Sequence, residues 1–133
     1  MRRGRTAIFS TITIPTLVIG GDSLFSATLA PDHQAMFDAL EPGPSLLAYA
    51  VLRETEHFTA LDDCEVPDEL LAALGGIPPA CQPGLLPWRY ARHIIDYLAL
   101  NFFDGVLNGN SDALARLDPG RLATIEELRW QAK

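Results

Sequence analysis

The sequence has little positive charge. Ten Lys and Arg residues stand against 17 Asp and Glu residues, which gives a formal net charge of −7 at pH 7. Apart from Arg2, Arg3 and Arg5, the arginines are scattered, so no basic stripe is present to neutralise the phosphates of a nucleic acid. The composition therefore argues against nucleic acid as a partner.

Long hydrophobic runs are also missing. No run of about 18 uninterrupted apolar residues occurs, so we expect no membrane-spanning segment. The start, MRRGR followed by AIFSTITIPTLVIG, has the charged-then-apolar order of a secretory signal. Two threonines and Pro15 interrupt this run, and residues 20–22 (GGD) are a poor cleavage context, which favours a structural strand. The location, whether secreted, periplasmic or cytoplasmic, stays open.

Cysteine is scarce as well. Cys64 and Cys81 are the only two, and no histidine lies near them at the spacing of a four-ligand zinc site. The sequence contains neither a phosphate-binding glycine loop nor a metal-ligand cluster, so it implies no cofactor and no metal. The two cysteines are either unrelated buried thiols or a disulfide, which would contribute about 3 kcal/mol in the chain-entropy model.

The apolar residues that are present suit one α/β domain or part of one, at 133 residues and 48% hydrophobic content. Residues 16–19 (TLVI) and 46–54 (LLAYAVLRE) are apolar with little alternation, which is typical of strands buried on both faces of a parallel sheet. Between them, residues 31–40 (PDHQAMFDAL) have apolar positions at helical spacing, opened by Pro31. Strand, helix and strand in this order predict a right-handed βαβ unit with parallel strands.

The second half of the chain predicts helices. Residues 66–76 and 111–117 indicate short ones, and 87–109 carries the strongest helical signal. Residues 118–133 are expected to be a tail with a possible last helical turn. The apolar stripe of the long helix is expected to consist of Ala91, Ile95, Leu98, Phe102 and Val106, widened by Ile94 and Phe103.

Two parallel strands are too few for a stable sheet, because independent stability usually needs three or more. Residues 1–133 therefore predict a single incomplete α/β domain that begins at the penultimate strand of a larger sheet. An exposed strand edge and an exposed apolar face favour association with another chain or aggregation. We expect the isolated chain to oligomerise or to be poorly soluble.

The candidate catalytic residues follow the two expected strands. Asp22 comes after the first strand, and His57 lies in the loop RETEHFTALDD after the second. Neighbouring parallel strands end at the same edge of a sheet, so we expect Asp22 and His57 to meet there. A carboxylate on one imidazole nitrogen fixes the tautomer and stabilises the imidazolium during proton transfer.

Three segments carry a family resemblance: PTLVIGGDSLF, YAVLRETEHFTALDDC and LPWRYARHIIDYLALNFFDGVLNGNSDALARLD. From about residue 12 to 117 they resemble the C-terminal part of an α/β-hydrolase, similar to predicted dienelactone hydrolases and platelet-activating-factor acetylhydrolase-like esterases. The resemblance implies a partial α/β-hydrolase fold, a small-molecule carboxylic ester as substrate and His57 as the catalytic histidine. It also favours a disulfide between Cys64 and Cys81, because relatives carry a cysteine pair there.

The chain departs from this family at two of the three catalytic positions. The family's spacing for the acid lands on Leu24, so that Asp22 is two positions early and Asp32 is a weaker substitute. No G-x-S-x-G nucleophile elbow occurs in the sequence. We therefore expect a chain that supplies the acid and the histidine of a serine-type ester hydrolase, inactive unless a nucleophile-bearing part complements it.

Two alternatives remain open. The sequence VIGGDSLF resembles the start of Gly-Asp-Ser-Leu esterases, with Ser23 as nucleophile. Such enzymes also need a D-x-x-H near the C-terminus, and the nearest approach in this chain is Glu54-x-x-His57. In the other alternative, the chain is a non-catalytic subunit or a remnant that associates through its exposed sheet edge.

Overall fold

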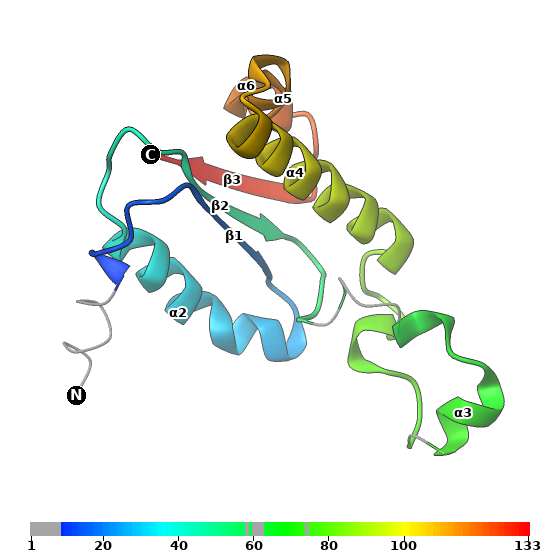
Figure 1. Cartoon of the computed structure of the whole chain (residues 1–133). Coiled ribbons are helices and arrows are strands. Elements are labelled where there is room, and N and C mark those ends of the chain that lie inside the picture. The colour runs from blue at the N-terminus through cyan, green and yellow to red at the C-terminus, as the bar shows by residue number, and fades with distance from the viewer. Residues whose placement is uncertain (1–8, 58, 60–62, 74) are drawn as a thin grey trace, which may run out of the picture.

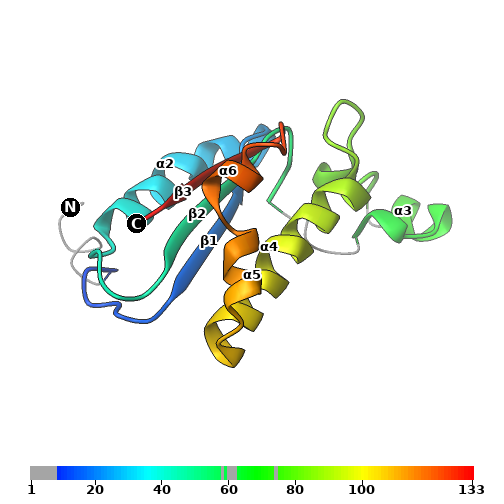
Figure 2. The same cartoon turned by 90° about the horizontal axis from the view of Figure 1, so that it is seen from above.

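A computed structural model describes residues 9–57, 59, 63–73 and 75–133. It is an α/β structure in which a three-stranded mixed sheet has a helix on each face (Figures 1 and 2). The strands are β1 (Thr16–Gly21), β2 (Leu47–Leu52) and β3 (Leu128–Ala132). The two helices on its faces are α2 (Leu24–Ala39) and α4 (Trp88–Asn108). The remaining elements are the 3-10 turns η1 (Asp63–Glu65) and η2 (Pro79–Cys81) and the short helices α3 (Asp68–Ala73), α5 (Ser111–Arg116) and α6 (Pro119–Leu122).

The predicted βαβ unit is confirmed in its order of elements and in the parallel pairing of its strands. β1 and β2 pair in parallel, in a register that runs from Thr16 opposite Leu47 to Gly21 opposite Leu52. All six residues of β2 are buried, as an apolar run without alternation predicts for a central strand. The carboxyl ends of the two strands therefore lie side by side.

The C-terminal residues form part of the sheet. Where the sequence predicted a tail with a helical turn, the structure has α6 and then β3, which pairs antiparallel with β2. Leu128 and Trp130 pack into the core on one face of β3, while Arg129 and Gln131 alternate with them. Five residues, of which only Leu128 and Trp130 are large and apolar, are a weak strand signal. Pairing with β2 makes this segment a strand.

Helix α2 begins earlier than predicted, at Leu24 rather than at Pro31, and Pro31 lies inside it. Ser23 occupies the N-cap position, but its side chain makes no capping hydrogen bond. Instead, the backbone N–H of Ser26 donates to the carboxylate of Glu56 at 2.7 Å. A cap that comes from thirty residues away cannot be found in the local pattern that marks a helix start.

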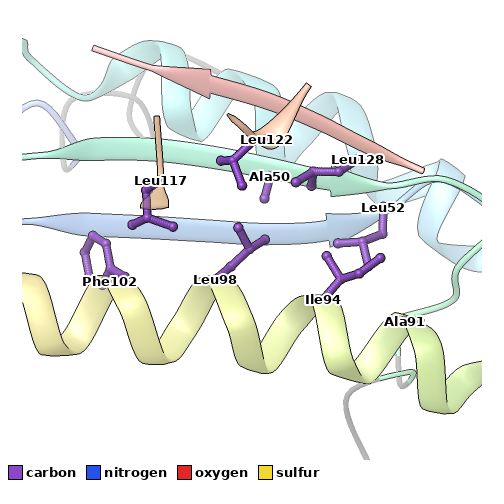
Figure 3. Packing of buried hydrophobic residues seen from close by; sticks show 9 residues of the cluster. All are labelled: Ala50, Leu52, Ala91, Ile94, Leu98, Phe102, Leu117, Leu122 and Leu128. Carbon is purple, nitrogen blue, oxygen red and sulfur yellow. The ribbon is translucent and has the colours of Figure 1, made fainter. Parts of the chain in front are cut away.

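Two apolar clusters cover the two faces of the sheet. On the α2 face, Phe37 and Leu40 pack with Val18, Tyr49 and Val51. On the other face, Ile94, Leu98 and Phe102 of α4 point toward the sheet and toward residues from α5 to β3 (Figure 3). This second cluster consists of Ala50, Leu52, Ala91, Ile94, Leu98, Phe102, Leu117, Leu122 and Leu128.

The buried face of α4 differs from the predicted stripe. Ile94 lies at its centre, whereas Phe103, expected to widen it, is 56% exposed. Leu100 and Leu107 lie on that same outward side and are also exposed. Gly105 accounts for part of this difference between the predicted and the buried face. A Cβ at this position would collide with the side chain of Leu114 in α5, so α5 packs closely on this side of α4. Periodicity locates the helix, but its neighbours decide which of two apolar sides is buried.

Between β2 and α4 the chain makes an excursion that contains η1, α3 and η2. Cys64 and Cys81 are joined by a disulfide that ties η1 to η2, with their Cα atoms 5.5 Å apart. The backbone N–H of Leu86 donates to the carbonyl of Glu54 at 2.8 Å and closes the excursion at its base. Within the described ranges, no helix combines the length and apolarity needed to cross a membrane.

Candidate functional site

The carboxyl ends of β1 and β2 are joined by direct contacts between two segments: residues 21–26, from the end of β1 to the first turn of α2, and the described residues 54–57 and 59 after β2. We call this region the strand-end junction. The backbone N–H of Glu54 donates to Oδ1 of Asp22 at 2.7 Å, and that of Ser23 donates to the carbonyl of Thr55 at 3.1 Å. Gly21 packs so closely on Thr55 that a Cβ would collide with the Thr55 carbonyl oxygen. A glycine at the end of β1 is therefore a requirement of the junction.

Asp22 lies where the sequence predicted, at the end of β1 and beside the loop that carries His57. Its Oδ1 accepts the hydrogen bond from Glu54, and its Oδ2 pairs with Nη2 of Arg129 at 3.0 Å. Both carboxylate oxygens thus already accept hydrogen bonds from groups other than His57. Asp22 holds the His57 loop through its backbone.

His57 lies in a tight turn at the surface. The carbonyl of Glu56 accepts a hydrogen bond from the N–H of Thr59 at 3.0 Å, and the hydroxyl of Thr59 accepts one from the N–H of Glu56 at the same distance. Thr59 is buried, while His57 is exposed. The exposed His57 is thus flanked by the buried residues Glu56 and Thr59.

Glu56 is the carboxylate that sequence reasoning missed. Its side chain is buried, with 3% of the residue exposed, and Oε1 accepts hydrogen bonds from three donors. These are the backbone N–H of Ser26 at 2.7 Å, the hydroxyl of Ser26 at 3.0 Å and the backbone N–H of His57 at 3.0 Å. Acidic side chains are rarely buried unless they are paired. Burial depends on the tertiary structure, so the sequence of a polar loop does not show which of its acidic residues is buried.

Arg129 was missed for a related reason. It belongs to the segment expected to be a tail, and the antiparallel pairing of β3 with β2 brings its guanidinium to Asp22. Asp32, the weaker candidate for the acid, is exposed in the middle of α2 and does not belong to the junction. Ser23, the candidate nucleophile of the alternative interpretation, is the N-cap residue of α2.

A groove of about 440 Å³ lies elsewhere, beside the first turns of α4. Its charged side chains are largely paired, since Arg89 bonds Glu65 at 2.6 Å and Arg92 lies 3.8 Å from Asp96. It is open to solvent and shares no residue with the junction, so we assign it no catalytic role. Its lining residues are Glu65, Trp88, Arg89, Arg92, His93 and Asp96.

The geometry defines an α/β protein with a polar site at the carboxyl ends of two parallel strands, the usual location of ligands in open α/β sheets. Among the described residues, no group of three or more His, Cys, Asp and Glu side chains is arranged to hold a metal ion. No family model matches this chain, and neither does any curated protein or solved structure.

Proposed function

We propose that this chain supplies the histidine and the acid of a serine-type carboxylic ester hydrolase, in the manner of the C-terminal part of an α/β-hydrolase. One observation carries the proposal. The strand-end junction holds Asp22 and the His57 loop together at the ends of two adjacent parallel strands, joined by the 2.7 Å hydrogen bond from Glu54 N–H to Asp22. The resemblance of the two loops and of α4 to that family supports it.

In this role His57 is the general base. As a serine oxygen attacks the ester carbonyl carbon, the imidazole takes the proton of the serine hydroxyl and then returns it to the departing alkoxide. A water molecule repeats the cycle on the acyl-enzyme, releasing the carboxylic acid and the serine. The exposure of His57 supports this role, because a serine from another segment can approach the imidazole.

Asp22 takes the role of the orienting carboxylate. An ionised carboxylate offers about four acceptor positions on its two oxygens, so it can keep its bonds to Glu54 and Arg129 while accepting one from an imidazole N–H. The charge of Arg129 competes with the imidazole for Asp22. Asp22 in this proposal therefore orients His57 chiefly through the backbone of its loop.

The serine has to come from outside the described fold, because no G-x-S-x-G occurs in the sequence. The outer edge of β1 pairs with no strand in the described part of the chain. A free strand edge presents unpaired N–H and C=O groups to another strand. We therefore place the complementing polypeptide along β1, next to the junction.

The experiment combines an ester with a serine-directed probe. The purified chain should release p-nitrophenol from p-nitrophenyl acetate no faster than its His57→Ala variant does, because no activated serine is present. A tagged chain isolated from its source cells and treated with a fluorophosphonate should carry with it a second polypeptide that is labelled on the serine of a G-x-S-x-G motif.

His93→Ala is the matched control, since His93 is an exposed histidine on α4. Labelling of the second polypeptide should be lost with His57→Ala and kept with His93→Ala. Labelling that does not depend on His57 would refute the proposal. A stoichiometric adduct on Ser23 of the chain itself would replace it with the Gly-Asp-Ser-Leu interpretation.

A second candidate is a non-catalytic subunit that binds another chain through β1. The observation in its favour is the composition of β1 (TLVIGG), which lacks any charged residue that would discourage edge pairing. In this case, His57→Ala leaves the associated complex and its activity unchanged, while a charge placed on β1 dissociates the complex.

A further inference from the structure

The strand-end junction concentrates the buried polar groups of the protein. In the described part of the chain, five polar or charged residues are buried, and only Asn101 lies outside the junction. The other four are Ser26, Thr55, Glu56 and Thr59. A hydrogen bond inside a protein is electrostatically stronger than the same bond in water. Glu56 is the only one of these four buried residues that has an ionisable side chain.

The carboxylate of Glu56 connects two parts of the junction. Its Oε1 accepts from the backbone N–H and the hydroxyl of Ser26 in the first turn of α2, and from the backbone N–H of His57. A carboxylate at a helix N-terminus is stabilised by the helix dipole and by charge-assisted hydrogen bonds. One oxygen atom thus anchors the His57 turn to the start of a sixteen-residue helix.

The second oxygen of Glu56 is the reason why a glutamine is not an equivalent residue here. Oε2 of Glu56 is buried and has no hydrogen-bond partner within the described residues. An uncharged glutamine of the same shape would place its amide N–H groups there without an acceptor, or would turn them toward the three donors. Buried groups left unsatisfied in this way destabilise the arrangement that holds them.

We propose that Glu56 is a positioning residue for His57, a role that rests on the proposed function of His57 as general base. Its carboxylate clamps the His57 turn to the N-terminus of α2 and thereby fixes the direction in which the imidazole leaves the junction. Asp22 holds the same loop two residues before Glu56, through the N–H of Glu54. The loop is therefore held on both sides of Thr55, and Glu56 accepts directly from the backbone N–H of His57.

The test uses NMR of the isotope-labelled 133-residue protein and needs neither substrate nor nucleophile. In Glu56→Gln, amide hydrogen exchange at Ser26 and at His57 should become at least about tenfold faster. The His57 ring Cε1–Hε1 signal should shift and show a lower order parameter. Glu54→Gln is the matched control. Glu54 lies two residues before Glu56 and its side chain is exposed, so the same substitution there should leave both readouts unchanged.

A coupling measurement separates positioning from general destabilisation. Ser26→Ala removes one donor to Glu56 and leaves the buried charge in place. It should change the His57 ring signal in the wild-type background and add nothing in the Glu56→Gln background. If Glu56→Gln fails to fold, Ser26→Ala alone decides: a His57 signal identical to that of the wild-type protein overturns the proposal.

The two proposals fail in different ways. Fluorophosphonate labelling that does not depend on His57 refutes the hydrolase function and leaves the anchoring of the turn intact. Unchanged exchange and ring dynamics in Glu56→Gln refute the positioning role and leave the hydrolase function intact.

Discussion

β1 and β3 both lie beside β2, one parallel to it and the other antiparallel, and each leaves one backbone edge without a neighbouring strand in the described part of the chain. The polar side chains of β3 contact the end of β1 and helix α2. Arg129 pairs with Asp22, Gln131 exchanges hydrogen bonds with Gln34, and Lys133 just beyond the strand donates to the carbonyl of Asp38.

β1 has none of these features. Its six residues, TLVIGG, contain no charge, and Leu17 and Ile19 are only partly buried although they pack against the core. Natural sheets protect their edges with short strands, charged side chains or proline. By this criterion β3 is built as an edge, whereas β1 has the composition of an interior strand. The difference supports a second strand on β1, as the proposed function requires.

The largest expected effect comes from removing the protected edge. A chain that ends at Glu127 lacks Leu128, which is 8% exposed in the core, and leaves the fully buried β2 without a neighbour on that side. We expect a loss greater than the about 3–5 kcal/mol of a single large-to-small core substitution. Urea unfolding followed by circular dichroism measures it. A chain lacking only Lys133 is the control, and equal midpoints for the two would mean that β3 does not support the sheet.

A charge on the unprotected edge should have the next largest effect. We expect the wild-type chain to self-associate through β1 and Thr16→Lys to weaken this association about tenfold, or about 1.4 kcal/mol. Gln131→Lys is the matched change on β3, where charges already flank the position, and should leave the association constant unaltered. Size-exclusion chromatography with light scattering measures both. A wild-type chain that is a monodisperse monomer with a cooperative melt contradicts the expectation.

The ion pair between Arg129 of β3 and Asp22 at the end of β1 should contribute little to the free energy of unfolding. Arg129→Gln removes the ion pair with Asp22, whose side chains are 53% and 27% exposed. Solvent and salt screen such a pair, so we expect a loss of no more than about 1 kcal/mol, which shrinks further in high salt. Thermal unfolding at two salt concentrations tests this. Arg89→Gln, which breaks the more exposed Arg89–Glu65 pair away from both edges, is the control. A loss above 2 kcal/mol, on the order of a core substitution, would make β3 part of the junction's support.

The smallest effect is expected where neither edge is involved, at the joint between α4 and α5. Hydrogen bonds from Asn108 and then Asn110 hold the pKa of Asp104 below its ordinary value of 3.8, and the charge of Arg116 adds to them. A pKa depressed in the folded state contributes stability above about pH 4 that is lost as the pH falls through the folded-state value. The melting temperatures of the wild-type protein and Asp104→Asn should differ most at neutral pH and converge toward pH 3.

The control for this titration is Asp32→Asn, which removes one exposed carboxyl group from the middle of α2. A gap between the wild-type protein and Asp104→Asn that stays constant from pH 7 to pH 3 would show that the two asparagine contacts do not respond to ionisation.

The sequence by itself determined the βαβ unit and the long helix. Unbroken apolar runs identified β1 and β2, and a strong 3.6-residue period identified α4, because these signals arise from burial along a single segment. The same pattern placed Asp22 at the junction and His57 in the adjoining loop, since parallel strands end at one edge. It left the pairing of Cys64 with Cys81 open, and the structure joins them.

Tertiary structure alone decided the rest. A distant Glu56 caps α2, so local signals placed the start of this helix too late. β3 is a strand because β2 offers it an edge, and Arg129 reaches Asp22 only through that pairing. The face of α4 that is buried depends on the residues it meets. In each case the deciding contact joins residues far apart in the chain, and such contacts leave no period in either segment.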